Sequence, residues 1–147
     1  MLLDHDEHAR WARTADRQLV VAWRLAGGEL HEAVVLHAEQ AVQCALKALL
    51  HGVGATSQAR SHDLRDLAHR CAECAGLSLA DDDLRGLRDL ALAYLPSRCP
   101  DAVPAGGAPQ DMFDRGDAVA ALRLALLVRR RARDAWRRLV AIEGIRE

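Results

Sequence analysis

Residues 37–50 read HAEQAVQCALKALL, and their apolar side chains return at spacings of three and four positions. Such spacing places the apolar residues along one side of an α-helix. The pattern begins after Gly27-Gly28 and ends at Gly52. It predicts a helix over residues 29–51, which would span roughly 35 Å at 1.5 Å per residue.

Four more segments show the same helical periodicity. Their predicted ranges are residues 4–26, 63–75, 78–95 and 114–142. Asp4 and Asp63 stand where a helix N-cap is expected, and the segment from Ser78 to Asp81 has the form of a capping box. Only a short turn separates the first two helices, so they must run antiparallel.

The composition favours a helical protein. Half of the residues are apolar, and most of these are Leu and Ala, which are strong helix formers. The β-branched and aromatic residues that are typical of strands are scarce. A length of 147 residues suits one domain with its own core and is short for two. We therefore expect a single all-α domain over residues 1–147, folded as an up-and-down bundle of four or five helices.

A segment rich in proline and glycine separates the last two predicted helices. Residues 96–113 contain all four prolines of the chain together with Gly106-Gly107. Loops of this length are uncommon in helical bundles. We expect this one to be functional, covered by a partner, or mobile.

The charge is nearly balanced overall but is unevenly distributed. A net charge of −1 gives no field that favours nucleic acid or a membrane. Six arginines crowd the last predicted helix: Arg129, Arg130, Arg131, Arg133, Arg137 and Arg138. A solvated helix face is the simpler interpretation of this cluster, and an RNA or phosphate patch is the alternative.

The N-terminal residues lack a basic region followed by an apolar run, as a signal peptide would have. No stretch approaches the ~18 apolar residues of a membrane span. We therefore expect a cytoplasmic protein with reduced thiols.

Four motifs stand in a characteristic order. Residues 37–50 come first, then Ser61-His62-Asp63-Leu64 at a helix start, then YLPSRCPD at residues 94–101, then the Ala-rich final helix. Together they resemble the HEPN family of prokaryotic helical domains over roughly residues 16–136. The resemblance implies a helical bundle that pairs into a homodimer, often beside a minimal nucleotidyltransferase protein. Nucleotide binding and ribonuclease toxicity are the roles proposed for such domains.

Two positions depart from the family pattern. The family commonly shows Gln-Ala-x-Glu-Lys in its second helix, whereas this chain has Gln43 and Cys44 in the last two places. The usual Arg-Tyr-Pro-Asp has Cys99 in place of tyrosine. The first change removes a possible general base or metal ligand, and the second removes a hydroxyl and a stacking surface.

Ribonuclease members of the family carry an arginine followed, after four to six residues, by a histidine in a late helix. The histidine would handle a proton and the arginine would neutralise charge on phosphate. Here the last histidine is His69, and Arg65 is one position too close to it. Arg24 and His31 have the spacing but straddle a turn between early helices, so we interpret this match as accidental. These observations favour a non-catalytic protein and leave the enzyme question open.

The predicted ligand groove combines the family motifs with residues that share a helix face. Its members are Gln40, Lys47, His62, Asp63, Tyr94 and Arg98. Gln40 and Lys47 are seven positions apart and lie almost over one another on one helix face, where an amide and an ammonium could hold a base and a phosphate.

Each of these residues also has a structural interpretation. Gln40 would bond a neighbouring helix, and Lys47 would extend to water. Asp63 would cap its helix, with His62 held by a local hydrogen bond. Tyr94 would close the core, and Arg98 would form a salt bridge.

Cys71-Ala72-Glu73-Cys74 has CxxC spacing, with His69 nearby. Zinc needs about four ligands, and the chain has no second CxxC motif and no HxxxH motif. We therefore interpret these cysteines as ordinary core residues and expect no metal site.

These interpretations favour a non-catalytic HEPN-like module, without a cofactor other than a possible nucleotide. It would bind a nucleotide or a partner, the expected partner being a nucleotidyltransferase-fold protein in a toxin–antitoxin-like pair. One alternative is a divergent ribonuclease toxin that uses His62 or His69. Another is a pure protein-interaction module without a small-molecule ligand. The scarcity of aromatic residues argues against single-stranded RNA as a ligand.

Overall fold

The computed structural model describes residues 2–146, and within them helices are the only regular secondary structure. The five long helices are α1 (His5–Leu25), α2 (His31–Gly52), α3 (Leu64–Ala75), α4 (Asp81–Ala93) and α6 (Arg115–Arg146). A single-turn helix, α5 (Pro109–Met112), and two 3-10 turns, η1 (Thr56–Arg60) and η2 (Pro100–Ala102), lie in the connections. The prediction of an all-α bundle is therefore confirmed.

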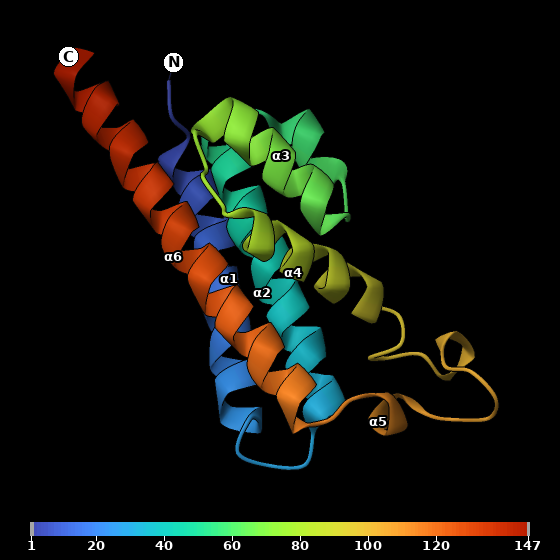
Figure 1. The fold of residues 1–147 in the computed structure, drawn as a ribbon. Coiled ribbons are helices and arrows are strands. Elements are labelled where there is room, and N and C mark those ends of the chain that lie inside the picture. The colour runs from blue at the N-terminus through green and yellow to red at the C-terminus, as the bar shows by residue number, and fades with distance from the viewer. Residues whose placement is uncertain (1, 147) are drawn as a thin grey trace.

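Helix α2 lies at the centre of the bundle. It packs against α1, α3, α4 and α6, and α1 also touches α6. Figure 1 shows α1, α2 and α6 as long rods lying side by side, with the shorter α3 and α4 on one flank. The turn at residues 26–30 makes α1 and α2 antiparallel, as its shortness predicts.

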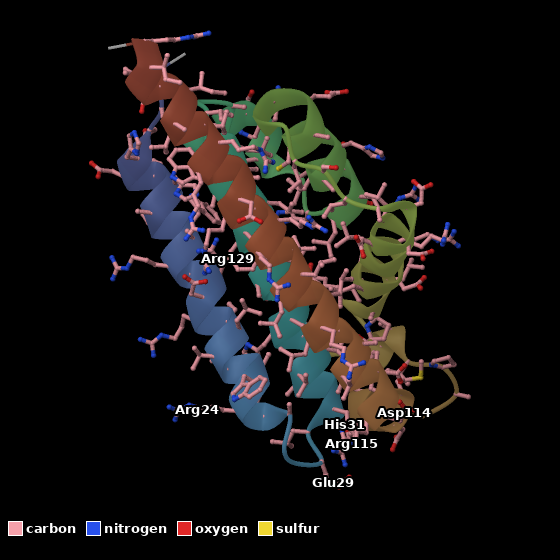
Figure 2. All side chains as sticks on the ribbon, turned by 60° about the vertical axis from the view of Figure 1, so that its left-hand side comes forward. Arg24, Glu29, His31, Asp114, Arg115 and Arg129 are labelled. Carbon is pink, nitrogen blue, oxygen red and sulfur yellow. The ribbon has the colours of Figure 1, made fainter. Side chains whose placement is uncertain are left out.

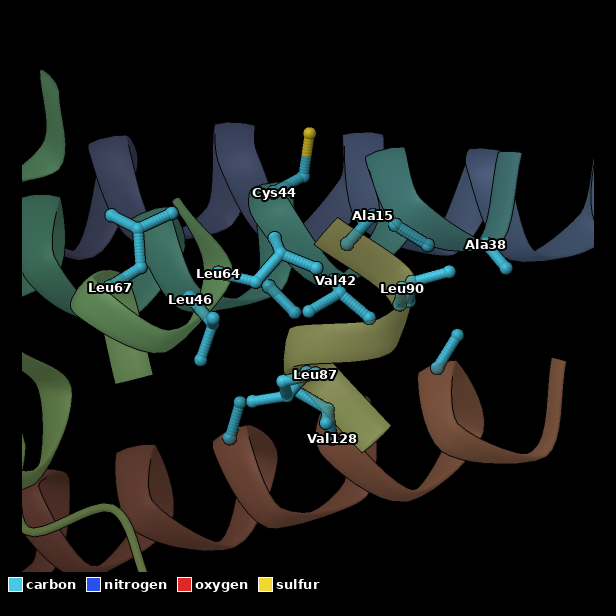
Figure 3. Close-up of a cluster of buried hydrophobic side chains, with 14 of the residues drawn as sticks. Ala15, Ala38, Val42, Cys44, Leu46, Leu64, Leu67, Leu87, Leu90 and Val128 are labelled. Carbon is cyan, nitrogen blue, oxygen red and sulfur yellow. The ribbon is translucent and has the colours of Figure 1, made fainter. Parts of the chain in front are cut away.

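Because its neighbours surround it, α2 has no freely exposed residue. Its alanines let the adjacent helices approach closely, and its larger apolar residues fill the core. Val42 of α2 lies near Leu87 of α4 and Val128 of α6 in Figure 3, and all three are fully buried. Burying one such side chain contributes roughly 1.5–3 kcal/mol, so α2 carries much of the stability of the fold.

Two of the predicted helix N-caps form in the structure. The Asp4 side chain accepts a hydrogen bond from the Glu7 amide, and the Asp63 side chain accepts one from the Asp66 amide. Both predicted caps are confirmed. Gly76 ends α3 in the left-handed conformation, with φ of 68°.

The predicted start of α4 was wrong. The helix begins at Asp81 rather than near Ser78, and the amide of Ala80 donates to the Asp83 carboxylate at 3.2 Å. Three consecutive acids thus occupy the first turn, where they complement the helix dipole. The predicted capping box at Ser78 does not form.

The segment 96–113, predicted as a loop, is partly ordered by its own turns. It contains η2 and α5, and Ser97 is buried, with its hydroxyl donating to the Tyr94 carbonyl at 2.8 Å. Ala105 and Gly106 both adopt positive φ, which reverses the chain between these two turns.

Helix α6 is longer than predicted and ties the two ends of the described chain together. The Glu143 carboxylate accepts a hydrogen bond from the Leu3 amide at 2.9 Å and lies 2.7 Å from Nε2 of His5. These contacts lie beyond residue 142, where the helix was expected to end. Tertiary bonds therefore account for the extra turn.

The expectation that no stretch approaches a membrane span was wrong for α2. Helix α2 is long and apolar enough to cross a membrane by length and composition alone. However, 78% of its most apolar window is buried inside the bundle. The apolarity of α2 is therefore explained by its place as the core helix.

His8 lies inside the contact between α1 and α6. Its ring stacks on Trp136 with centroids 3.7 Å apart and planes 5° from parallel. Burial lowers the pKa of His8 to about 4, and the charges of Arg129 and His5 add to the effect. The folded protein therefore holds His8 neutral at a pH where an unfolded histidine would begin to bind a proton.

This difference predicts a specific pH dependence of stability. Between the unfolded pKa of 6.5 and the folded pKa of about 4, only the unfolded chain binds the proton, so stability falls as pH is lowered through this window. The contribution of one such group is at most about 1.4 kcal/mol per pH unit. We expect His8→Phe, which keeps a ring against Trp136, to show a shallower loss of stability in urea titrations between pH 7 and 4. Equal slopes in the two proteins would contradict the assignment.

Candidate functional site

A buried acid lies at the centre of the polar residues on α2. Glu39 is 1% exposed. Its two carboxylate oxygens accept hydrogen bonds from the side-chain amides of Gln43 at 2.6 Å and Gln40 at 2.7 Å. Burial raises the pKa of Glu39, whereas the two amide bonds and the charges of Arg98 and Lys47 lower it. Glu39 is therefore bonded on both oxygens and orders its neighbours.

The order set by Glu39 extends to α3. The Gln43 amide group donates to Glu39, so its carbonyl oxygen is the atom that faces Nδ1 of His62, at 3.2 Å. A carbonyl can only accept, so we assign the proton of His62 to Nδ1. The exposed His62 ring then presents Nε2 as a hydrogen-bond acceptor.

A cation lies over an aromatic ring where α4 ends. The Arg98 guanidinium carbon is 4.2 Å from the centroid of the Tyr94 ring, a cation–π contact. Backbone bonds from Ser97 to Ala93 and from Cys99 to Leu95 hold the turn that carries Arg98. Helix α4 packs against α2, and the charge of Arg98 at its end helps to lower the pKa of Glu39.

Lys47 is a second cation of this region. It is 7% exposed and makes no hydrogen bond or ion pair within residues 2–146. Its Nζ lies 5.8 Å from the centroid of the Trp11 ring, which stacks in turn on His51. The stem is enclosed by its neighbours, whereas Nζ is not one of the buried nitrogens that lack a partner, so the ammonium group is accessible to a ligand from the surface. An anionic ligand group would therefore be stabilised beside Lys47.

The structure brings five of the six predicted site residues into one region. Gln40 and Lys47 lie on α2, His62 joins them through Gln43, and Tyr94 and Arg98 approach from the end of α4. Asp63 is occupied in capping α3. We call the group Glu39, Gln40, Gln43, Lys47, His62, Tyr94 and Arg98 the α2 polar cluster.

Two structural interpretations from the sequence need correction. Gln40 bonds Glu39 of its own helix rather than a neighbouring helix. His62 is held by Gln43, nineteen positions away, and not by a local bond.

The fold and the order of motifs match those of a known family. The model of the HEPN domain matches residues 8–135. The chain belongs to the HEPN domain family. The whole α2 polar cluster lies inside the matched region, so these residues are part of the HEPN domain itself.

Two solved structures resemble this HEPN domain. TT1696 from Thermus thermophilus is 27% identical, with a TM-score of 0.76, and the match covers 88% of this chain and 98% of that one. ST0689, an archaeal HEPN homologue, is 25% identical, with a TM-score of 0.67 and coverage of 86% and 95%. The search of curated proteins gives no match.

The pair with ribonuclease-like spacing does not form a site in this HEPN domain. Figure 2 shows Arg24 projecting from the end of α1, away from His31, which lies with Asp114 and Arg115 at the start of α6. His31 Nε2 is 3.6 Å from the Glu29 carboxylate. The two residues therefore have separate surroundings.

The arginine cluster on α6 is divided by the fold. Arg129 is buried and forms a two-pronged ion pair with Asp16 of α1, at 2.7 and 3.2 Å. Arg130, Arg131, Arg133 and Arg137 are exposed. Arg129 is therefore a structural link between α1 and α6 and does not belong to a solvated face.

The CxxC cysteines have different partners. Cys71 is buried and its thiol donates to the Leu46 carbonyl at 3.2 Å, while Cys74 faces the Gln58 side chain at 3.7 Å. Burial raises the pKa of the Cys71 thiol. In the described part of the chain, no group of three His, Cys, Asp or Glu side chains is arranged to hold a metal ion.

Sequence reasoning missed Glu39, and it recognised Gln43 only as a departure from the family pattern. Glu39 lies one helical turn before Gln43, and only the structure shows that it points into the core. An acid at such a position must be bonded by its neighbours. In this HEPN domain, an acid therefore lies one turn before the position where the family commonly has one.

The contact from Gln43 to His62 predicts the tautomer of His62. At a pH where the ring is neutral, ¹⁵N NMR should show the proton of His62 on Nδ1. Gln43→Leu removes the acceptor, so we expect the proton to move to Nε2, the form favoured by free imidazole side chains. His69, which is exposed, is the internal control in the same spectrum. If His62 of the wild-type protein carries its proton on Nε2, the chain of hydrogen bonds that joins Glu39, Gln43 and His62 is absent.

Proposed function

We propose that this HEPN domain is a non-catalytic module that binds a nucleotide at the α2 polar cluster. The observation that supports the proposal best is Lys47, whose stem is enclosed and whose ammonium group makes no ion pair among the described residues. A phosphate beside Lys47 would supply that missing partner.

The neighbouring groups fit the other parts of a nucleotide. Arg98 adds a second cation, and its stack on Tyr94 forms a flat surface on which a base can pack. His62 offers an acceptor to a ribose hydroxyl or a base N–H. Gln40, half-buried, keeps a second amide hydrogen besides the one given to Glu39.

A protein partner is the second part of the proposal. Family resemblance supports a homodimer and a nucleotidyltransferase-fold protein as a partner in a toxin–antitoxin-like pair. Large apolar side chains are exposed around the end of α4 and the following linker, with Leu92 at 68%, Leu95 at 51% and Met112 at 44%. Exposed apolar groups of this size are common where proteins bind one another.

Thermal melting with and without ATP, ADP, GTP and UTP tests the nucleotide site. Binding to the folded state at 100 times Kd adds about 2.7 kcal/mol of stability, a shift of several degrees. We expect one nucleotide to raise the melting temperature, and we expect Lys47→Met and Arg98→Ala to abolish the rise. Lys47→Met keeps most of the buried stem, so the packing around Trp11 is preserved.

Arg130→Ala is the matched control, because Arg130 is an exposed arginine on α6 that is not a member of the cluster. No shift with any nucleotide at millimolar concentration would overturn the proposed site and favour the pure interaction module. RNA incubated with the same protein should remain intact. Cleavage that disappears in His62→Ala would instead support the ribonuclease alternative.

A further inference from the structure

A cleft of 360 Å³ lies on the flank of the bundle between α4 and α6. Leu90 of α4 and Leu124 of α6 form its walls, Val35 of α2 lies at its base, and Phe113 borders it. None of its lining residues belongs to the α2 polar cluster. The cleft is therefore a second candidate binding site, separate from the proposed nucleotide site.

The charges of the cleft have one sign. Asp89 of α4 and Asp117 of α6 line it, and no lysine, arginine or histidine does. A phosphate ligand would be repelled by these carboxylates, whereas a cation would be attracted. The cleft thus favours a ligand opposite in charge to a nucleotide.

Asp89 is available to such a ligand. It is exposed and makes no hydrogen bond or ion pair with any residue between 2 and 146. The arginine one turn before it, Arg85, is paired with Asp82 instead. No residue of α4 therefore forms an ion pair with Asp89.

Local hydrogen bonds fix the opposite side of the cleft. The Asp114 amide donates to Oδ2 of Asp117 at 3.0 Å, and the Asp117 amide donates to Oδ1 of Asp114 at 2.9 Å. This reciprocal cap sets the start of α6 and holds the preceding residue, Phe113, at the cleft. Oδ1 of Asp117 has no partner among the described residues and can accept a further bond.

We infer that this cleft binds a small organic cation with an apolar body. The ammonium group lies between Asp89 and Asp117 and near the Phe113 ring, where carboxylates and an aromatic ring both attract a cation. The apolar body packs against Leu90, Leu124 and Val35. A cleft volume of 360 Å³ lies within the range of roughly 300–1,000 Å³ that is common for small-molecule sites.

The test compares three probes of the same length. Hexylammonium is the cation, 1-hexanol the neutral analogue and hexanoate the anion, each titrated into protein with ¹³C-labelled methyl groups. We expect hexylammonium to shift the methyl signals of Leu90, Leu124 and Val35. It should bind at least about fivefold more tightly than 1-hexanol, because a charge-assisted bond is stronger than a neutral one. Hexanoate should bind most weakly.

Two variants show whether the cleft is responsible. Asp89→Asn should reduce the affinity for hexylammonium to about that for 1-hexanol, whereas Asp81→Asn, an acid on α4 outside the cleft, should leave it unchanged. Ala120→Leu places a larger side chain at an exposed position lining the cleft and should abolish binding of both. Equal affinity for hexylammonium and 1-hexanol, or no shift of these methyl signals at millimolar probe, would overturn the inference. Neither outcome depends on whether a nucleotide binds.

Discussion

The complete enclosure of α2 is the constraint on which the structure depends. The other four long helices and the short α5 pack around it, so no residue of α2 is freely exposed. A helix in that position must be apolar almost throughout, and a carboxylate or amide that points into the core needs a partner there. The alanines satisfy the first condition by letting neighbours approach. The bonds among Glu39, Gln40 and Gln43 satisfy the second.

This arrangement divides the assembly of the α2 polar cluster into two stages. Glu39, Gln40 and Gln43 lie within about one turn of α2, so their bonds can form as soon as that helix does. His62 and Arg98 arrive only when α3 and the end of α4 pack against α2. The geometry of the cluster is therefore as stable as the docking of the two short helices. A substitution in the contact between α2 and α3 can disturb the cluster without touching it.

Most of the fold could be predicted because the signals that start, continue and end a helix are local. Glycine stops, aspartate caps and the three-and-four spacing predicted all five long helices with small errors. The start of α4 was mistaken because two local caps competed, whereas the end of α6 depends on tertiary bonds from Glu143 to residues near the N-terminus. Spacing alone cannot say that Glu39 points inward. It also cannot show that Asp89 and Asp117, on different helices, border one cleft.

The bonds of Glu143 also indicate how strongly the fold depends on the order of the helices along the chain. Leu3 and Glu143 are joined although nearly the whole described chain lies between them. This bond brings the beginning of the described chain next to its end. A circularly permuted chain, opened in the linker at Gly106-Gly107 and joined near residues 2 and 146, would meet the same helix contacts in a different order. The contacts between helix faces specify the bundle. The positions of the chain ends do not.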